Sequence, residues 1–470
     1  MDYQDCADLL ERLHGRPRGL PHGELKANVP RLLAALGSPE RALRGMLVVG
    51  TNGKGSTCAF AVSAVGASGV RVGSMPSPHL QEHRERIRVD GVPASRTEYA
   101  AALGEVWRAV EAHALPVLVA GLHTVTAAVH FRSAGVSLAV AEASIGGSSA
   151  AAAKLGLDVK VVTGIGLDHA DLLGNSIAEI TRAKVTATQR GDHVLLGRLC
   201  PEAATTAREV LKERAPRSVW RIGHEIGYSV RTVEGDHGPE VLVDVTTPRT
   251  VHHDLPCPLP GAHQHHNLAL AVAGMDAMVE RGHIPAPDGT HLRERLAATR
   301  WPGRLELLPD ARLDDWKGQV LLDGATNPQG ITTVAPEILA HARTHTRTHP
   351  DQPPAVVFSA FEDKDVAAML APLPTHWPLV LTRTRSPHSS NPSTMHSLLD
   401  PARHGPALTA DDTRTALHRA GELAGPDGLI IVIGSLRLGV YQDFGVRHPF
   451  GLGVDLAVGV GRLAHTRPAD

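Results

Sequence analysis

A glycine-rich turn between an apolar strand and an apolar helix constrains this chain more than any other feature. Residues 46–59 read MLVVGTNGKGSTCA, which places Gly50 and Gly53 between the end of the strand and the start of the helix. Glycines there let the backbone turn its N–H groups toward an anion, and the N-terminus of the following helix favours negative charge. Because Lys54 adds a cation, the segment predicts a phosphate-binding loop for a nucleoside triphosphate.

This loop departs from the usual P-loop pattern in two places. The strict pattern has glycine where Val48 stands and a hydroxyl residue directly after the lysine, whereas here Gly55 precedes Ser56 and Thr57. We assign triphosphate binding to the whole turn and helix start. The candidate residues are Gly50, Thr51, Asn52, Gly53, Lys54, Gly55, Ser56 and Thr57.

Length and composition narrow the class of protein. A chain of 470 residues with 42% hydrophobic content exceeds what one core usually holds, so two or more domains are expected. A net charge of -2 gives no support for binding nucleic acid or a membrane surface. The four scattered cysteines are typical of reduced thiols, and no signal peptide or long apolar run is evident. We therefore expect a cytoplasmic protein.

Short β-branched segments alternate with alanine-rich helical stretches along most of the chain. This rhythm predicts an α/β fold with a parallel sheet and crossover helices. The first set of expected strands covers 47–50, 138–143, 160–167 and 193–197. The second set covers 319–325, 355–361, 378–384 and 429–435.

Two interruptions divide this pattern. Residues 225–260 alternate as closely spaced strands and predict an antiparallel insertion, which a helix over 267–281 follows. Trp301, Pro302 and Gly303 then break the pattern, so we place a boundary between domains 1–300 and 301–470. The second domain is expected to be a smaller α/β unit.

Three polar residues follow expected strands and could hold a metal ion. Phosphates bring Mg²⁺, which prefers oxygen ligands, and Ser77, Glu142 and His169 would share one edge of a parallel sheet. Each also has a purely structural explanation. Ser77 can start a turn before Pro78, Glu142 can cap a turn, and His169 can be a hydrogen-bonded loop histidine.

Eight ordered motifs give the chain a resemblance to a known family. It resembles folylpolyglutamate synthase and dihydrofolate synthase, of the Mur ligase superfamily, over nearly its whole length. The motifs are GTNGKGST at 50–57, SPHLQEHRERIRVDG at 77–91, TGIGLDHADLLGNSIAEITRAK at 163–184, LPGAHQHHN at 259–267, RWPGRLELL at 300–308, LLDGATNP at 321–328, EDKD at 362–365 and GSLRL at 434–438.

The resemblance implies a fold and a reaction. The fold would be Mur-ligase-like, with a parallel-sheet P-loop ATPase domain followed by a smaller Rossmann-like α/β domain. The enzyme would use ATP to convert a carboxylate into an acyl phosphate, which an amino acid attacks to give an amide, ADP and phosphate. The implied partners are a small carboxylic acid and an amino acid, glutamate by default, with the protein acting as a monomer.

The resemblance also assigns metal and catalytic roles. Ser77 and Glu142 would hold one Mg²⁺, and His169 would hold a second together with Lys184, which matches the family lysine that becomes carbamylated. Two such ions would spread the charge of the transferring phosphoryl group. The implied catalytic residues are Lys54, Lys184, His169 and Arg304. The structural alternative for Lys184 is an exposed lysine on a helix.

Further family positions concern the rest of the nucleotide. Gln264 and Asn267 match a segment near the adenine, Arg304 matches a linker arginine that reaches the phosphates, and Asp323 matches an acid near the ribose. Together they imply closure of the second domain over ATP, which would keep water from the acyl phosphate. Alternatively, Arg304 pairs with a surface acid and Asp323 caps a turn.

Departures from the family pattern fall on the side of the acid and the amine. The family run Arg-Leu-Asp-Ala-Thr-Asn, whose acid helps to hold a pterin, is replaced by SSAAAAK at 148–154. Thr326 replaces a histidine, His388 an arginine, and His123 an acidic residue. Since a histidine clamps a carboxylate less well than a guanidinium does, the sequence predicts retained ligation with the identity of both substrates left open.

Three classes of function therefore stay open. The first is an ATP-dependent ligase, acting on folate and glutamate or on another acid and amine in a specialised pathway. The second is a P-loop NTPase or kinase that stops at phosphoryl transfer. The third is a nucleotide-binding protein without catalysis.

Overall fold

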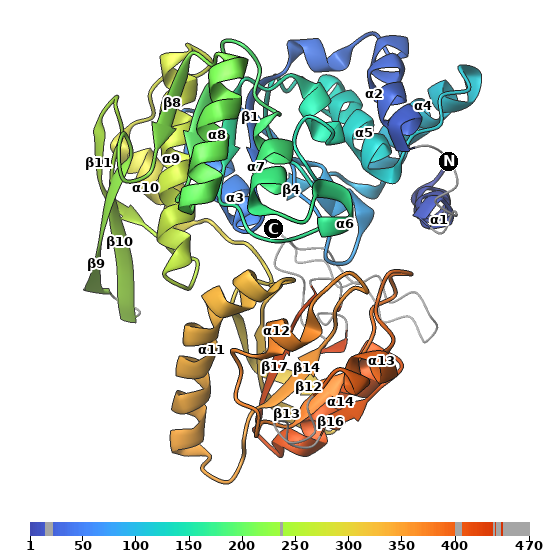
Figure 1. The fold of residues 1–470 in the computed structure, drawn as a ribbon, viewed down its shortest axis with the longest axis vertical. Helices are drawn as coiled ribbons and strands as arrows, with labels where there is room; N and C mark the ends of the chain where they lie inside the picture. The colour runs from blue at the N-terminus through green and yellow to red at the C-terminus, as the bar shows by residue number, and fades with distance from the viewer. Residues whose placement is uncertain (15–21, 236–237, 400–406, 436–437, 439–442, 445–470) are drawn as a thin grey trace, which may run out of the picture.

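The protein forms two lobes that are stacked along its long axis (Figure 1). The computed structural model describes residues 1–14, 22–235, 238–399, 407–435, 438 and 443–444. Leu436 and Arg437 of the GSLRL motif lie outside these residues. The larger lobe carries an eight-stranded and a three-stranded sheet, and the smaller lobe carries a six-stranded sheet. The predicted α/β class with parallel sheets is confirmed.

The eight-stranded sheet has the order β4-β3-β2-β5-β1-β6-β7-β8. The six strands β2, β5, β1, β6, β7 and β8 pair in parallel. At one edge β3 pairs antiparallel with β2, and β4 pairs antiparallel with β3. The strands are β1 (Arg44–Val49), β2 (Val72–Met75), β3 (Arg88–Val89), β4 (Val92–Pro93), β5 (Leu138–Glu142), β6 (Val159–Val162), β7 (His193–Leu196) and β8 (Ser218–Arg221).

Helices cover both faces of this sheet, as parallel sheets require. Along β1, Met46 and Val48 belong to one buried cluster and Leu47 and Val49 to another, because successive side chains point to opposite faces. The helices are α1 (Tyr3–His14), α2 (His22–Ala35), η1 (Pro39–Ala42), α3 (Lys54–Gly66), η2 (His83–Arg86), α4 (Arg96–Ala112), α5 (Val119–Ser133), η3 (Ala151–Leu155), α6 (Ala170–Leu173), α7 (Ile177–Val185), α8 (Pro201–Arg214), α9 (His263–Glu280) and α10 (Gly289–Ala297).

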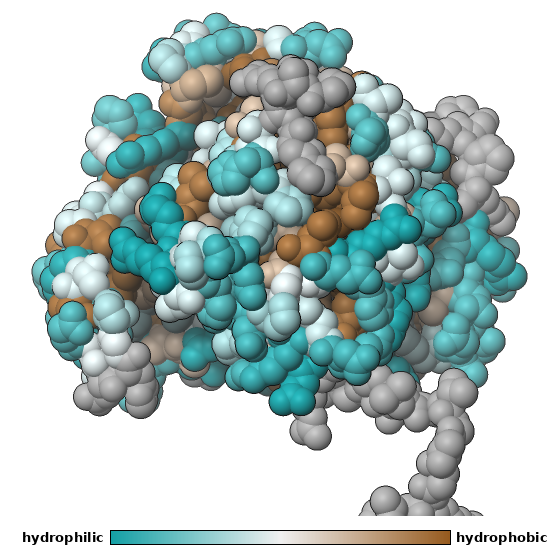
Figure 2. Space-filling model, turned by 90° about the horizontal axis from the view of Figure 1, so that it is seen from below, coloured by the Kyte–Doolittle hydropathy of each residue, from teal (hydrophilic) through white to brown (hydrophobic). Residues whose placement is uncertain are grey.

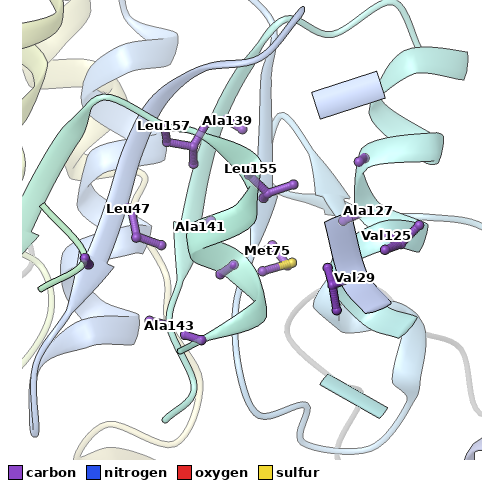
Figure 3. Close-up of a cluster of buried hydrophobic side chains, with 14 of the residues drawn as sticks. Val29, Leu47, Met75, Val125, Ala127, Ala139, Ala141, Ala143, Leu155 and Leu157 are labelled. Atoms are coloured by element: carbon purple, nitrogen blue, oxygen red, sulfur yellow. The ribbon is translucent and has the colours of Figure 1, made fainter. Parts of the chain in front are cut away.

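Small side chains on the strands let the helices approach closely. Figure 3 shows Ala139 and Ala141 of β5 in the cluster that also holds Leu47 and, from the helices, Val29 and Val125. Opposite them, α3 and α9 pack on the other face, where Gly274 lies against Met46. Burial of this apolar surface on both faces fixes the strand ends that carry the polar residues described below.

The predicted antiparallel insertion is present as a three-stranded sheet that projects from the side of the larger lobe (Figure 1). It contains β9 (Gly227–Gly235), β10 (Gly238–Thr246) and β11 (Val251–Pro256). Buried hydrogen bonds attach it to α9, since Asp276 accepts from the Thr247 hydroxyl at 2.7 Å and contacts His252 Nε2 at 2.9 Å.

The smaller lobe follows after α10 and has the sheet order β12-β13-β17-β14-β15-β16. Its strands are parallel except for β12, which pairs antiparallel with β13. The strands are β12 (Glu306–Leu313), β13 (Trp316–Leu322), β14 (Ala355–Phe358), β15 (Leu379–Leu381), β16 (Ala407–Thr409) and β17 (Leu429–Ile433). The helices are α11 (Pro328–Thr348), α12 (Val366–Leu370), α13 (Pro392–Ser397) and α14 (Thr413–Ala424).

The predicted strands differ from the observed ones at their ends; the strand expected over 319–325 is β13 (Trp316–Leu322), and the one expected over 378–384 is β15 (Leu379–Leu381). Two elements beside the site differ as well. The strand expected over 160–167 ends at Val162, because from Thr163 the chain turns to hydrogen-bond with the loop after β1. The helix expected over 267–281 begins earlier, at His263, and ends at Glu280.

The surface is mixed in character. Seen from the side of the smaller lobe, hydrophobic side chains form separate patches among hydrophilic ones (Figure 2). Within the described part of the chain, none of the helices combines the length and hydrophobicity needed for a bilayer crossing.

Candidate functional site

A cavity of about 620 Å³ lies between the two lobes, where the carboxyl edges of both large sheets face each other. The loops after β1, β5 and β6 line it from the larger lobe, and those after β13, β14 and β17 from the smaller lobe. In open α/β sheets this edge is the usual place for ligands. Most of the predicted site residues meet here.

The loop after β1 has the geometry of an anion cradle. Gly53 caps α3 in the left-handed region at φ 81°, and a Cβ there would come within 2.5 Å of Asn267 Oδ1. Gly50 is equally restricted, since its Cβ would meet Thr163 Oγ1 at 2.0 Å. Lys54 bends back to donate to the Thr51 carbonyl at 2.8 Å. The first turn of α3 therefore opens into the cavity with its N–H groups and a lysine.

Hydrogen bonds from the loop after β6 hold this cradle in place. Thr163 Oγ1 donates to the Asn52 carbonyl at 2.6 Å, and the Thr51 N–H donates to the Gly164 carbonyl at 2.8 Å. The Thr51 hydroxyl donates to Gly166 O and accepts from the Gly166 N–H. The cradle is thus preorganised by a segment more than 100 residues away.

Lys184 lies beneath the cradle, with 3% of its surface exposed. Its Nζ donates to the Gly50 carbonyl at 2.8 Å. Burial, with the nearby charge of Lys54, lowers its pKa to about 7. The structural alternative of an exposed helical lysine is therefore wrong. An amine of this kind is largely neutral above neutral pH, the form that reacts with electrophiles.

Glu142 ends β5 inside the cavity and is 5% exposed. Its Oε2 accepts from the Ser77 N–H at 3.0 Å, so the two residues predicted to share a metal are neighbours. Burial raises the pKa of Glu142, although Lys54 and the Ser77 N–H oppose the rise. A buried carboxylate of this kind is stabilised by a cation at the cavity side.

His169 enters the cavity from the start of α6, in the left-handed region at φ 52°. Its Nδ1 lies 3.7 Å from Asp363 Oδ2 of the smaller lobe. Burial lowers the pKa of His169, which favours the neutral ring needed of a metal ligand.

The residues predicted to lie near the adenine have unequal positions. Asn267 lines the cavity, and its Oδ1 accepts from the Thr57 hydroxyl at 3.4 Å. Gln264 is fully buried behind it and accepts from Asn267 Nδ2 at 2.9 Å. The geometry therefore makes Gln264 a support for Asn267.

Arg304 and Asp323 line the cavity near the junction of the lobes. Asp323 is 3% exposed, and its carboxylate accepts from the Leu305 and Ala325 N–H groups at 2.9 and 2.8 Å. Burial raises the pKa of Asp323, while the Arg304 charge opposes the rise. Asp323 thus also fixes the backbone beside Arg304.

Direct contacts join the two lobes at the cradle. Asn52 and Asn327 exchange two side-chain hydrogen bonds, at 3.1 and 3.0 Å, and Asn52 Nδ2 also donates to Gln329 Oε1 at 3.3 Å. Lys364 Nζ pairs with Asp168 Oδ1 at 2.6 Å, with both side chains less than a tenth exposed. The phosphate loop itself is therefore part of the contact between the lobes.

The cavity does not take in every predicted residue. Gly50, Thr57, Gln264 and Lys184 lie directly behind its lining. Sequence reasoning missed Asp168, Asn327 and Lys364, which connect the lobes. Two features of the sequence could have indicated these residues: Asp168 directly precedes His169, and Lys364 belongs to the EDKD motif.

The four departures from the family pattern occupy different places. Thr326 lines the cavity, whereas His388 is exposed and does not. His123 is buried in α5, where its Nδ1 lies 3.2 Å from the Tyr99 hydroxyl. Part of the segment 148–154 lines an adjoining pocket.

Comparison with known proteins identifies relatives over nearly the full chain. No family model matches. The chain is 30% identical over 449 residues to a probable bifunctional folylpolyglutamate synthase/dihydropteroate synthase of Haloferax volcanii, which covers 93% of this chain but only 49% of that protein. It is also 30% identical over 450 residues to dihydrofolate synthase/folylpolyglutamate synthase of Mycobacterium tuberculosis, covering 89% and 87% of the two chains.

A solved structure agrees with these matches. The folylpolyglutamate synthase of Mycobacterium tuberculosis, in a study of complexes with ADP and AMPPCP, superposes with a TM-score of 0.79 at 29% identity, covering 94% of this chain and 98% of that one. The nucleotides of those complexes agree with the phosphate cradle found here. The chain therefore belongs to the folylpolyglutamate synthase/dihydrofolate synthase family of ATP-dependent ligases.

Proposed function

We propose that this protein joins a small carboxylic acid to an amino acid, with glutamate as the default amine, at the expense of ATP. The observation that carries the proposal is the cavity between the lobes, which combines the phosphate cradle, the buried Glu142, Arg304 and Asp323. An enzyme that only hydrolyses ATP needs the cradle but not a site between two lobes, whereas an intermediate that water would destroy needs such shielding. A kinase also shields its phosphoryl transfer from water, so the assay below separates it from a ligase.

The residues at the cavity suit Mg²⁺, which needs few protein ligands, better than a metal ion that is held by protein side chains alone. Among the described residues, no three His, Cys, Asp or Glu side chains converge to hold an ion. Mg²⁺ instead binds one or two protein ligands and completes its shell with phosphates and water. Ser77 and Glu142 would hold one Mg²⁺, and His169 with a carbamylated Lys184 the second; when bound, the ions would spread the charge of the transferring phosphoryl group.

Carbamylation of Lys184 is supported by its surroundings. Its amine must be neutral to attack CO₂, with loss of a proton, and a pKa of about 7 supplies that form. The product is an anion, which Lys54 would attract, whereas Lys54 repels the protonated form of the amine.

The reaction has two chemical steps, which take place in the cavity between the lobes. The cradle and Arg304 hold the phosphates, while a carboxylate oxygen of the acid attacks the γ-phosphorus and ADP leaves. The amine nitrogen then attacks the acyl carbon, loses a proton, and expels phosphate through a tetrahedral intermediate. The inter-lobe bonds of Asn52 and Lys364 would hold the two lobes together around the reactants during both steps.

Trapping of the acyl phosphate tests this proposal. The purified protein is incubated with ATP, Mg²⁺ and a panel of carboxylic acids, with glutamate or hydroxylamine as the nucleophile. We expect one ADP for each product formed, which is a hydroxamate with hydroxylamine and an N-acylglutamate with glutamate. ADP release without trapping would identify an NTPase, a stable phosphorylated product would identify a kinase, and nucleotide binding alone would identify a protein without catalysis.

A further inference from the structure

The segment between α10 and β12, which joins the two lobes, lies along α3, the helix that begins at the phosphate cradle. Near the start of the segment, the buried Thr299 donates from its hydroxyl to Ser63 Oγ of α3 at 2.8 Å. Two residues later, Trp301 packs against the buried cluster to which α3 contributes Cys58 and Phe60. The chain therefore leaves the larger lobe along the helix that is expected to bind phosphate.

Trp301 occupies the place that a side chain at position 55 would need. A Cβ on Gly55 would come within 2.8 Å of Trp301 Nε1 and within 3.4 Å of Trp301 Cε2. The usual P-loop has a hydroxyl residue directly after the lysine, where this chain has Gly55. The indole that lies on the first turn of α3 explains this departure from the pattern.

Arg88 of β3 lies over the ring of the same indole, with its Cζ 4.8 Å from the ring centroid. The arginine is 4% exposed, and its Nε donates to the Glu85 carbonyl at 2.8 Å. Burial lowers the pKa of Arg88 to about 10, so the guanidinium keeps its charge at neutral pH. A cation held over an indole and away from water stabilises the ring in place. Trp301 is therefore fixed between the phosphate helix and an edge strand of the large sheet.

Arg304 follows three residues after Trp301 and lines the nucleotide cavity. The backbone next to Arg304 is bonded to the smaller lobe. The Leu305 N–H donates to Asp323 at 2.9 Å, and the carbonyl before Arg304 accepts from the Gly324 N–H at 3.0 Å. The position of the guanidinium relative to the cradle therefore depends on the smaller lobe and on the attachment of Trp301 to the larger lobe.

We propose that Trp301 is a positioning residue for ATP, which acts through Arg304. Its indole, lying on Gly55 and held by Arg88, fixes the joining segment to the start of α3, so that the cradle and the Arg304 guanidinium meet the same phosphates. The indole lies outside the lining of the cavity, so no contact with the nucleotide is assigned to it. The inference rests on the proposed function, because that function assigns Arg304 to the phosphates.

A double-mutant cycle on nucleotide binding tests the inference without ligation. Isothermal titration measures the affinity for AMPPCP with Mg²⁺, because this ATP analogue keeps three phosphates and does not transfer the last one. Trp301→Ala should weaken binding about tenfold, and Arg304→Met about tenfold or more, as for loss of a charge-assisted hydrogen bond. The double variant should bind only about as weakly as Arg304→Met, because the two residues act on the same contact.

Matched variants separate positioning from folding. Trp107→Ala on α4 removes another half-buried indole of the larger lobe, and it should leave the affinity for AMPPCP unchanged. Trp301→Phe keeps an aromatic face for Arg88, so its affinity should stay within about threefold of the wild type. A tryptophan that only contributed to stability would give wild-type affinity in all three folded variants.

Gly55→Ala perturbs the same contact from the helix and gives the answer if Trp301→Ala does not fold. Its Cβ displaces the indole, so it should weaken AMPPCP about fivefold or more in the wild type, but less than twofold in the Arg304→Met background. Gly66→Ala is the control on the same helix, because its Cβ would meet the flexible end of the Arg295 side chain. Its affinity should equal that of the wild type.

The outcomes separate this inference from the proposed function. Wild-type affinity in Trp301→Ala and Gly55→Ala, or losses that add to the loss in Arg304→Met, would overturn the inference. Unchanged affinity in Arg304→Met would overturn it too, while hydroxamate formed by the wild type would still support the ligase. Conversely, coupled losses of AMPPCP affinity without hydroxamate from any acid would support the positioning role and refute the ligase.

Discussion

Lys184 has two separable roles in the candidate site. Lys184 donates to the carbonyl of Gly50 and so supports the cradle, while its low pKa suits a covalent modification. The first role needs only a hydrogen-bond donor, and the second needs an amine. Substitutions that keep one property and remove the other can therefore separate them.

Replacing Lys184 by glutamine should keep a donor near Gly50 but lose the proposed metal ligand. We expect ADP formation to fall by about 10²-fold or more in Lys184→Gln, as for removal of one preorganised electrostatic group. Circular dichroism should show an unchanged fold. Lys212→Gln, an exposed lysine on α8, serves as the control, and activity near the wild-type level in Lys184→Gln would remove the lysine from the mechanism.

The same lysine should make stability depend on pH. Burial lowers its pKa from 10.5 in the unfolded chain to about 7 in the folded one, so between these values only the unfolded chain carries the proton. Stability of the wild type relative to Lys184→Gln should then rise with pH from about 7 to 10.5, by up to about 1.4 kcal/mol per pH unit. Below pH 7 the difference should be constant. Urea unfolding at several pH values, without bicarbonate, measures it, and a pH-independent difference would contradict the buried amine.

At the scale of elements, the sequence predicts those strands that a local pattern of apolar residues determines. The apolar runs before Gly50 and Glu142 identify strands, and the shared edge of parallel strands brings their ends together. The stretch 163–167 could not be placed in the same way, because Thr163 and Ile165 continue the β-branched pattern of the preceding strand. Its structure follows instead from hydrogen bonds to Thr51 and Asn52, more than 100 residues away.

Contacts between the lobes were likewise beyond the reach of local pattern. Asp168 and Lys364 are 196 positions apart, and each alone is an ordinary loop residue. The charged pair forms only once both folds place their loops at one cavity. Lys184 lies between these cases, since the family resemblance identified it and only its burial shows that it is not an exposed lysine.

Substitution of Gly53, at the start of α3, tests whether the shape of the cradle is needed to bind ATP. Gly53→Ala forces both a left-handed backbone and a collision with Asn267, whereas Gly69→Ala, at φ 75°, forces a similar backbone with nothing within 4 Å. Both should lose about 1 kcal/mol of stability for the backbone. Only Gly53→Ala should raise the KM for ATP, by about tenfold or more, in an ADP-release assay. Equal KM values for the two variants would contradict the close approach of Asn267.

On the scale of the whole molecule, polar contacts help to hold the two lobes together, beside the packing of Leu80 against a core cluster of the smaller lobe. Lys364 pairs with Asp168 across the junction with both side chains buried, and the Asp168 carboxylate raises the pKa of Lys364 despite its burial. Loss of Lys364 would leave the buried Asp168 carboxylate without its nearest cation, although Asn327 Nδ2 would still donate to it at 3.2 Å, and such a loss is costly.

Removing this pair should loosen the junction more than it affects either lobe. Lys364→Met is expected to lower the free energy of unfolding by about 3 kcal/mol and to increase the radius of gyration measured by X-ray scattering. Lys317→Met provides the control, because Lys317 and its partner Asp310 are both exposed. A variant as compact and as stable as the wild type would show that the other junction contacts suffice.

The reciprocal amide pair of Asn52 and Asn327 makes nucleotide affinity and lobe docking thermodynamically linked quantities. Asn52 sits in the loop expected to surround the phosphates, so any ligand that orders this loop also orders the surface on which the second lobe docks. By reciprocity, whatever factor docking adds to nucleotide affinity, the nucleotide must add to docking. A nucleotide bound at this loop would therefore favour the docked arrangement of the two lobes through the Asn52 side chain.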